Sequence, residues 1–482
     1  MYTINKIVGY LISPAGFSII LVAAAVLALA AGGVRADGVP SPAALGAKMA
    51  EQLFRTKPEV YKPIGCDTER PWYGGGKMMY CVVATWVNAL EMARVSGNKE
   101  LMDRLLDIYP RIVLPETKAI PLADCVDNTL FGALPLEVGM LTGNKEALAL
   151  GFKFADTQWT MPYSAVRKNW ATPPEAELKQ LIADGYTPQT RLWIDDMYMI
   201  TALQVQAARA AKGKDRMKYL DRAAREMHLY IEKLQRDDGL FVHSHDVPIV
   251  WGRGNGWMAG GMTLLLCELP DSHPERAYIL ASFRRFAEAL ETYQRPNGLW
   301  GQIVDDPESW DESSGSAMFA YLFAKGVNRY LIEWGYLGKA KKAYEALAAK
   351  VDQYGNVADV CEGTNAKNDR EHYLQRPRVN GAPYGQAAME LLCTALHEES
   401  VAKPRKAKYK QLTPMERAAA GNVAKPGEFR LESTYENISV SWGAPKEFRD
   451  GVRMEYRKSG ETAWREALAP LFFSPNRNGS RK

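Results

Sequence analysis

Apolar residues recur every three or four positions through much of the chain between residues 42 and 398. The pattern is clearest from Met217 to Leu234 and from Ile279 to Tyr293. Because this spacing puts the apolar side chains on one face of a helix, it predicts amphipathic helices packed on a common core. Glycine-containing turns follow such segments, as expected where a helix ends in a left-handed residue.

The turns after these segments also resemble one another. They contain Gly239, Gly298 and Gly355, which are 59 and 57 residues apart. Each interval has room for two helices and two loops, and self-similarity at such a period is typical of stacked helical hairpins. Residues 37–398 therefore predict an all-α domain of about six hairpins. They would close into an (α/α)6 barrel or, alternatively, remain an open solenoid.

The pattern changes near residue 399. A basic run from Lys403 to Lys410 is typical of a linker, which we assign to residues 399–427. Ile438, Val440 and Trp442 then alternate with polar residues, which predicts strands. Residues 428–482 should form a β-rich segment similar to part of a fibronectin type III-like sandwich, since a full sandwich needs about 100 residues.

The first 36 residues have the features of a signal peptide. Lys6 supplies the positive charge, Phe17 to Ala31 form an uncharged apolar run, and Val34-Arg35-Ala36 offers small residues for cleavage. The apolar run is short for a membrane span. We therefore expect cleavage after Ala36, a periplasmic or secreted protein, and no stable membrane insertion afterwards.

Composition narrows the function classes only slightly. The 482 residues carry a formal net charge of +4, which is small for this length and gives no reason to expect a nucleic-acid partner. The six cysteines are scattered without a Cys-x-x-Cys pair, so they do not form the disulfide framework of a small secreted domain. Most of them should be buried as small apolar side chains.

Two tryptophans flank an arginine on a glycine-rich segment, Trp251 to Trp257. Indole rings stack on sugar rings, and the planar guanidinium of Arg253 could grip a carboxylate through two hydrogen bonds. The combination indicates a site for an acidic saccharide. The alternative is structural, with Arg253 bound to backbone carbonyls and Trp251 and Trp257 in the core.

Two acidic segments are candidates for the chemistry. Asp195 follows Trp193, whose apolar wall would raise the pKa of the carboxyl and keep a proton on it near neutrality. Alternatively, Asp195 or Asp196 only complements the dipole of the helix that begins there. Asp127 is either a helix cap or a functional carboxylate.

His243 and His245 lie close enough in sequence to suggest a metal site. The chain has six histidines, however, and no third ligand has a suitable spacing, so we predict no metal and no other cofactor. His243 is better suited to donate to sugar hydroxyls. Further along, Ser313 or Ser314 should cap the next helix.

Four motifs in order resemble one known family. They are WIDDMYM (193–199), HSHDVPIVWGRGNGW (243–257), WDESSGSAMFAYLFAKG (310–326) and VCEGT (360–364). They are similar to the unsaturated rhamnogalacturonyl hydrolases, glycoside hydrolase family 105, which are related to the unsaturated glucuronyl hydrolases of family 88. The resemblance spans roughly residues 60–395 and excludes both ends of the chain.

The resemblance implies an (α/α)6 barrel that removes a 4,5-unsaturated uronic acid from lyase-generated oligosaccharides. One acid protonates the vinyl ether and water then adds to it, without a covalent enzyme intermediate. The resemblance makes Asp195 that acid, and Asp127 the residue that orients the ring or helps to activate water. The residues that would contact the substrate are Trp193, Met199, His243, Trp251, Arg253 and Trp257.

One feature departs from the family pattern. Many members carry a histidine shortly before the Trp-x-Asp motif, whereas this chain has Tyr186 to Arg191 there without one. Arg191 could replace its contact, and the preferred linkage could differ. Two other functions remain open. An inverting glycosidase would use Asp127 and Asp195 as its two carboxylates. A helical carbohydrate-binding protein would use neither for catalysis.

Overall fold

The computed structural model describes residues 38–55, 73–74, 77–115, 118–168 and 172–402, and four short strands between residues 430 and 466. The chain divides into two compact units, Met1–Ala402 and Lys403–Lys482, which are considered separately. The predicted signal peptide and nearly all of the predicted linker lie outside the described residues. Among the described residues, no helix is both long and apolar enough to cross a bilayer.

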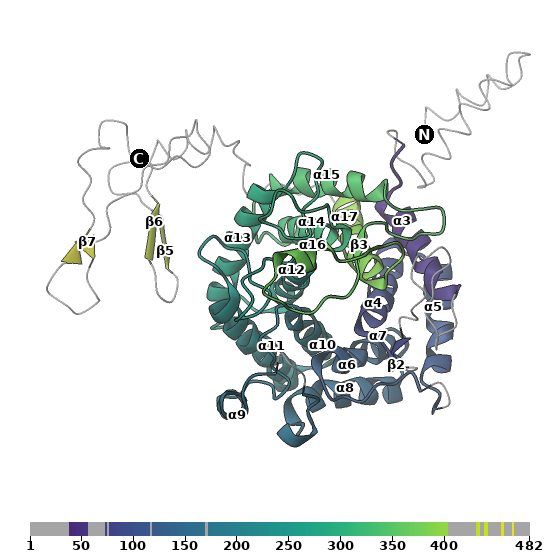
Figure 1. The fold of residues 1–482 in the computed structure, drawn as a ribbon. Coiled ribbons are helices and arrows are strands. Elements are labelled where there is room, and N and C mark those ends of the chain that lie inside the picture. Colours follow the sequence, from purple (N-terminus) through teal and green to yellow (C-terminus); the bar gives the residue numbers. More distant parts are fainter. Residues whose placement is uncertain are drawn as a thin grey trace, which may run out of the picture. The chain divides into compact units, whose positions relative to one another are not determined.

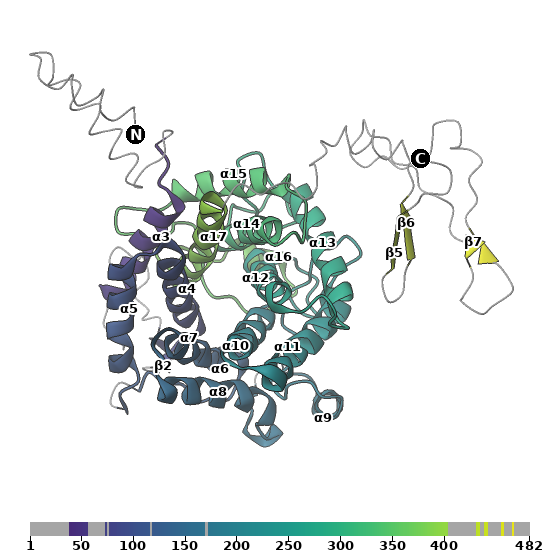
Figure 2. The same ribbon diagram turned by 180° about the vertical axis from the view of Figure 1, so that it is seen from behind.

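An inner ring of six helices forms the centre of the first unit (Figures 1 and 2). Each inner helix packs against the next, and the last packs against the first, so the ring is closed. The closed barrel predicted from the sequence is therefore confirmed, and the open solenoid is wrong. The inner helices are α4 (Tyr80–Ser96), α7 (Ala133–Thr142), α10 (Asp196–Ala210), α12 (Gly252–Glu268), α14 (Ser313–Asn328) and α17 (Pro383–Val401).

Each inner helix packs against at least one outer helix. The outer helices bury one face only, whereas α12 and α14 are buried on nearly every side, as expected for helices inside a large core. The first helix of the described residues, α3, is the outer partner of the last inner helix, α17, and so completes the ring. The outer helices are α3 (Pro42–Ala50), α5 (Lys99–Ile112), α8 (Lys145–Thr160), α11 (Gly213–Leu234), α13 (Arg276–Tyr293) and α15 (Tyr336–Ala348).

The repeated turns connect neighbouring hairpins. Gly239, Gly298 and Gly355 have φ values of 94°, 91° and 87°, which favour glycine. A Cβ atom on Gly239 would lie 2.5 Å from the carbonyl oxygen of Arg285 in α13. A Cβ atom on Gly355 would lie 2.8 Å from that of Lys48 in α3. The period seen in the sequence thus reflects one turn that packs on the outer helix of the next hairpin.

Short elements lie between and beyond the long helices. Two two-stranded antiparallel sheets belong to the first unit, and in one of them Val360 pairs with Val379. In the second unit β5 (Arg430–Ser433) pairs with β6 (Ile438–Ser441), and β7 (Glu455–Tyr456) with β8 (Arg465–Glu466). The remaining elements are η1 (Glu51–Phe54), β1 (Tyr73–Gly74), β2 (Lys77–Met78), α6 (Val126–Thr129), η3 (Leu130–Gly132), η4 (Tyr163–Ala165), α9 (Glu175–Ala183), β3 (Val360–Cys361), α16 (Arg370–Leu374) and β4 (Arg378–Val379).

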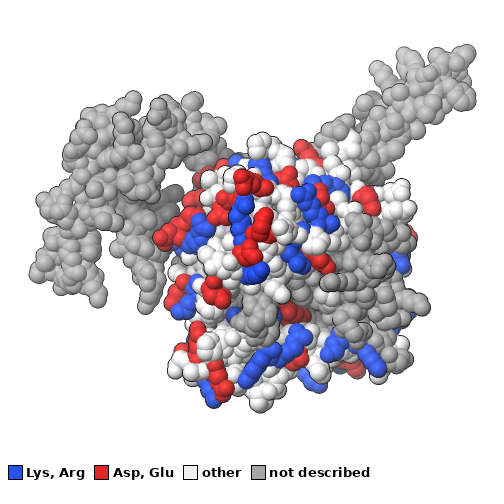
Figure 3. Space-filling model, in the orientation of Figure 1, with Lys and Arg blue, Asp and Glu red and all other residues white. Residues whose placement is uncertain are grey.

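Charged residues of both signs share the surface of the first unit. On the face drawn in Figure 3, the described lysine and arginine side chains alternate with aspartate and glutamate, without a broad patch of one sign. This mixture accords with the small formal net charge of the sequence. That face therefore does not carry the one-sided positive charge that would attract a polyanion from a distance.

Candidate active site

The N-terminal ends of the inner helices meet at one end of the barrel. Asp195 precedes α10, Arg253 lies in the first turn of α12, and Tyr384 lies in the first turn of α17. Arg253 contacts the ring of Tyr384, which shows that these ends converge. Because a helix carries partial positive charge at its N-terminus, this end of the barrel favours anionic ligands.

Asp195 is the central carboxyl of this cluster. It is 8% exposed, and its Oδ1 atom has no hydrogen-bond partner among the described residues. Its pKa is raised to about 7, mainly by burial and also by the charge of Asp196, while Arg253 and Arg191 oppose the rise. A carboxyl in this state retains its proton near neutrality and can act as a general acid.

His243 lies beside Asp195, with 3.8 Å between Nε2 and Oδ1. Its Nδ1 atom is 2.6 Å from the hydroxyl of Tyr373, which also accepts the N–H of Lys367. Burial lowers the pKa of His243 well below its ordinary value, so the ring is neutral. If the Tyr373 hydroxyl donates its proton to Nδ1, the ring proton is on Nε2 and faces Asp195.

Asp127 is the more accessible acid of the site. It lies in α6, its side chain is 26% exposed, and it forms a two-pronged ion pair with Arg191 at 3.1 and 3.2 Å. The N-cap of α6 is Cys125, so the interpretation of Asp127 as a cap is wrong. Asp195 precedes α10 without accepting a capping hydrogen bond. Neither carboxylate therefore accepts a helix-capping hydrogen bond.

Arg253 is buried between two aromatic rings. Its guanidinium carbon lies 4.6 Å from the ring centroid of Trp251 and 4.4 Å from that of Tyr384. It donates to the backbone carbonyls of Cys361 and Glu362. The structural interpretation of Arg253 is thus confirmed, because these bonds fix the loop after β3. Its grip on a substrate carboxylate stays a prediction.

The aromatic residues predicted to contact the sugar lie in two settings. Trp193 is 9% exposed and stacks on the His243 ring, with ring centroids 5.4 Å apart. Trp251 and Trp257 are fully packed, Trp251 against His243 and Trp257 against Tyr198. Met199, one turn after Asp195, lies in the main core. The sugar contacts of Trp251, Trp257 and Met199 stay predictions.

The cap of α14 differs from the expectation. The N-cap is Glu312 rather than Ser313 or Ser314, and its carboxylate accepts the N–H groups of Ser314 and Gly315. Glu312 also accepts the N–H of Cys361. A carboxylate has enough lone pairs for all three donors, which a serine hydroxyl has not. It therefore joins α14 to the strand that carries Cys361.

Sequence reasoning missed three residues of this site. Asp196 is the ion-pair partner of Arg191 rather than a simple helix-dipole charge. Tyr230 in α11 donates to Asp196, and Tyr373 in α16 contacts His243 from 130 positions away. Neither tyrosine belongs to a motif near its partner. Only the five-residue spacing of Arg191 and Asp196 gave a local signal.

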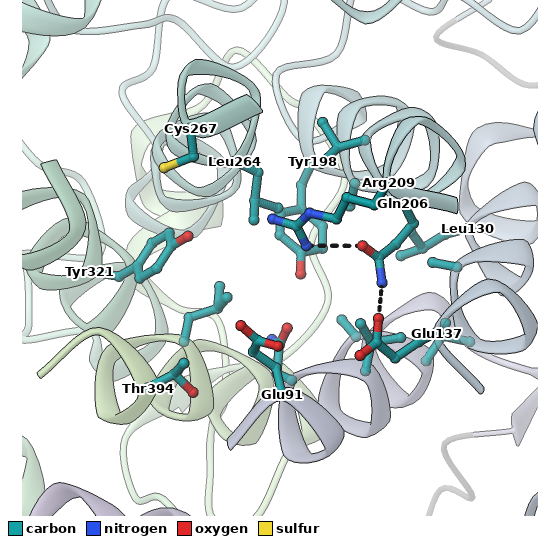
Figure 4. Close-up of a pocket in the computed structure, with 18 of the residues that line it drawn as sticks. Glu91, Leu130, Glu137, Tyr198, Gln206, Arg209, Leu264, Cys267, Tyr321 and Thr394 are labelled. Carbon is teal, nitrogen blue, oxygen red and sulfur yellow. Dashed lines mark hydrogen bonds between the residues drawn. The ribbon is translucent and has the colours of Figure 1, made fainter. Parts of the chain in front are cut away.

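A cavity lies between the inner helices, inside the barrel (Figure 4). It is lined along the inner helices, from Val83 and Tyr198 near their N-terminal ends to Glu91 and Arg209 near their C-terminal ends. Its volume of about 60 Å³ is far below the roughly 300–1,000 Å³ of ordinary ligand pockets. Arg209 is already bound to Gln206 and Glu268. We therefore place the candidate active site at the N-terminal ends of the inner helices.

Within the described residues, no group of three potential metal ligands occurs.

The closed ring of helical hairpins defines the chain as an (α/α)6-barrel protein, with a buried carboxyl at the N-terminal ends of its inner helices. The model of Glycosyl Hydrolase Family 88 matches residues 156–399, so the chain belongs to that family. The family match confirms the resemblance to unsaturated uronyl hydrolases that the sequence motifs indicated.

Two curated relatives agree with this assignment. The chain is 31% identical over 181 residues to an unsaturated 3S-rhamnoglycuronyl hydrolase of Formosa agariphila, covering 34% of this chain and 48% of the relative. It is 30% identical over 217 residues to the unsaturated rhamnogalacturonyl hydrolase YesR of Bacillus subtilis, covering 42% and 60%. The chain thus spans about half the length of these relatives.

A solved structure shares the fold. It is a possible member of family GH105 from Salmonella enterica serovar Paratyphi A, with a TM-score of 0.62 and 20% identity. The match covers 76% of this chain and 95% of that one.

Proposed function

We propose that this protein is a glycoside hydrolase that removes 4,5-unsaturated uronic acids from the non-reducing ends of lyase-generated oligosaccharides. The observation that carries the proposal is the unequal state of the two acids. Asp195 is buried and holds a proton near neutrality, whereas Asp127 is ion-paired with Arg191. One available proton donor is what the hydration of a vinyl ether needs.

The reaction proceeds in balanced steps. Asp195 gives its proton to C4 of the sugar, the double bond is lost, and positive charge develops at C5 and the ring oxygen. Water adds to C5 and its proton returns to the Asp195 carboxylate. The resulting hemiketal opens to a ketone, and the hemiacetal left at C1 then releases the alcohol of the next sugar. The overall change consumes one water molecule.

The surroundings of Asp195 suit this path. With the Tyr373 hydroxyl donating to Nδ1, the Nε2 proton of neutral His243 faces Asp195 and can stabilise the carboxylate that forms after proton transfer. The converging helix N-termini favour the uronate. Asp127 lies at the exposed side of the cluster, where it can orient the ring or the attacking water.

The substrate and the location are finer proposals. The names of two relatives combine a uronic acid with rhamnose. We infer a uronyl-rhamnose linkage for this chain as well, in a pectin or ulvan fragment. The apolar N-terminal segment favours export to the periplasm or the medium, where such fragments arise.

The test is a panel of oligosaccharides made by lyases from pectin, ulvan and glycosaminoglycans. Loss of the ultraviolet absorbance of the vinyl ether, with the released sugars identified by mass spectrometry, is the expected result. Asp195→Asn should lose at least about a thousandfold in kcat, because a general acid and its proton are gone. Persistent absorbance with every digest would reject the proposal.

A saturated polymer included in the same panel tests the inverting-glycosidase alternative. That mechanism needs a second carboxylate free to activate water, whereas Asp127 is held by Arg191. Release of sugars from the saturated polymer would favour the alternative. Binding without any product would favour a carbohydrate-binding protein.

A further inference from the structure

Arg191 joins two carboxylates at the edge of the candidate active site. Its Nη atoms lie 3.1 and 3.2 Å from the two oxygens of Asp127, and its Nε atom lies 3.0 Å from Oδ1 of Asp196. Such a planar fork fixes a carboxylate in orientation as well as in position. The side chains of Arg191 and Asp196 are buried, so Asp127 is the accessible member of the three.

Tyr230 holds this arrangement from the side of α11. Its hydroxyl donates to Oδ2 of Asp196 at 2.8 Å and accepts the backbone N–H groups of Arg191 and Leu192. Leu192 has a φ of 55°, a left-handed conformation that costs an L-residue about 1–2 kcal/mol. Backbone strain of this kind persists where the surroundings enforce it, and it is concentrated at functional sites.

The charges of this cluster act on the proton donor. Burial raises the pKa of Asp196, yet both of its oxygens accept hydrogen bonds, from Arg191 and from Tyr230, as an ionised carboxylate does. The other polar groups that face Asp195 are Arg253 on α12, neutral His243 and the hydroxyl of Tyr373 on α16. Asp196 favours retention of the proton on Asp195, and Arg253 and Arg191 oppose it.

We propose that Arg191 is a positioning residue that holds Asp127 in its working orientation, with Asp196 as a counter-ion fixed by Tyr230. Neither Arg191 nor Asp196 contacts the substrate in this assignment. Arg191 therefore does not take over the substrate contact of a histidine. The inference rests on the proposed function, because it describes how the same site is held in place.

The first test is Arg191→Lys, which keeps the charge but loses the fork that spans two carboxylates. We expect kcat to fall at least about tenfold while KM stays within about twofold, because orientation rather than binding is lost. The matched control is Arg209→Lys, the same change at a two-partner arginine at the other end of the barrel (Figure 4). It should leave kcat unchanged. A wild-type kcat in Arg191→Lys would overturn the proposal.

The second test is Asp196→Asn, which keeps the shape but removes one negative charge next to Asp195. The alkaline limb of the pH profile of kcat/KM should move to lower pH by about one unit, because Asp195 then gives up its proton more easily. A purely structural role for Asp196 would not move this limb. An unshifted limb in the folded variant would overturn the proposal.

Two further outcomes are decisive. Loss of folding in both variants, with Arg209→Lys folded, would assign the cluster to the fold alone and overturn the proposal. If the wild type consumes none of the lyase products, the proposed function fails by itself. Carboxyl ¹³C NMR titration then tests the cluster separately, with the Asp195 signal expected to titrate at lower pH in Asp196→Asn. An unchanged titration would reject it.

Discussion

Nε2 of His243 lies 3.8 Å from Oδ1 of Asp195, and neither atom has a hydrogen-bond partner among the described residues. Two buried polar atoms at this distance can each bind a substrate atom, or can form a hydrogen bond with each other after a small movement. Asp195 can then pass its proton to a substrate atom, and His243 can donate to the carboxylate that remains.

The pH dependence of the activity should follow from this state of Asp195. Because the protonated carboxyl is the reactive form and its pKa is raised to about 7, kcat/KM should be level below that pH. Above it, kcat/KM should fall about tenfold per pH unit. The measurement is a pH profile of vinyl-ether loss. A profile that is still level at pH 9 would remove Asp195 as the proton donor.

Tyr373→Phe should weaken catalysis by changing His243. Without the hydroxyl at Nδ1 the ring loses the bond that fixes its tautomer, and a proton on Nδ1 leaves Nε2 unable to donate toward Asp195. A hydrogen bond is worth roughly 1 kcal/mol, so we expect kcat to fall about fivefold. Steady-state kinetics provide the measurement.

The control for that variant is Tyr344→Phe in α15. It removes a buried hydroxyl that donates to the carbonyl of Pro40, away from the site. It should lower the thermal midpoint and leave kcat unchanged. Equal kcat values for the two variants would show that the Tyr373 hydroxyl does not act through His243.

The barrel was predictable because the sequence patterns of its helices and turns are local and repeat along the chain. The spacing of Gly239, Gly298 and Gly355 follows from one turn that packs on the next outer helix. The acids were found because Asp195 lies within a compact motif. The partners of these residues were not predictable, since Tyr373 reaches His243 only through the closed ring. The left-handed backbone of Leu192, which precedes Trp193, was also not predictable, because leucine rarely adopts that conformation.

Close packing between α10 and α12 gives a prediction on stability. A Cβ atom on Gly261 would lie 2.6 Å from the carbonyl oxygen of Met197, two residues after Asp195. Gly261→Ala should therefore cost about 1–3 kcal/mol of unfolding free energy and lower kcat as α10 shifts. Gly338→Ala, at a helical position with open space around it, should instead stabilise by about 0.5–1 kcal/mol. Chemical denaturation compares the two, and equal effects would contradict the packing argument.

Glu226 in α11 is a buried carboxyl that should make the stability depend on pH. Burial raises its pKa to about 8. Its two oxygens face the hydroxyl of Thr190 and the N–H of Thr187, and the Thr190 hydroxyl also donates to the carbonyl of Thr187 at 2.8 Å. Because that hydroxyl has one proton, Glu226 must supply its own to the bond with Thr190. The hydrogen bonds thus agree with a protonated Glu226.

The sign of the pH effect follows from the raised pKa of Glu226. The folded state binds a proton that the unfolded chain releases above its ordinary value of 4.5, so the stabilisation is complete below pH 4.5 and is lost as pH rises toward about 8. Each pH unit in this window costs up to about 1.4 kcal/mol. Glu226→Gln keeps both hydrogen bonds without a titrating proton, and should flatten the decline. Thermal melts from pH 5 to 9 measure it, with Glu177→Gln at an exposed site of α9 as the control. If Glu226→Gln declines as steeply as the wild type, Glu226 is ionised in the folded protein and the hydrogen-bond argument is wrong.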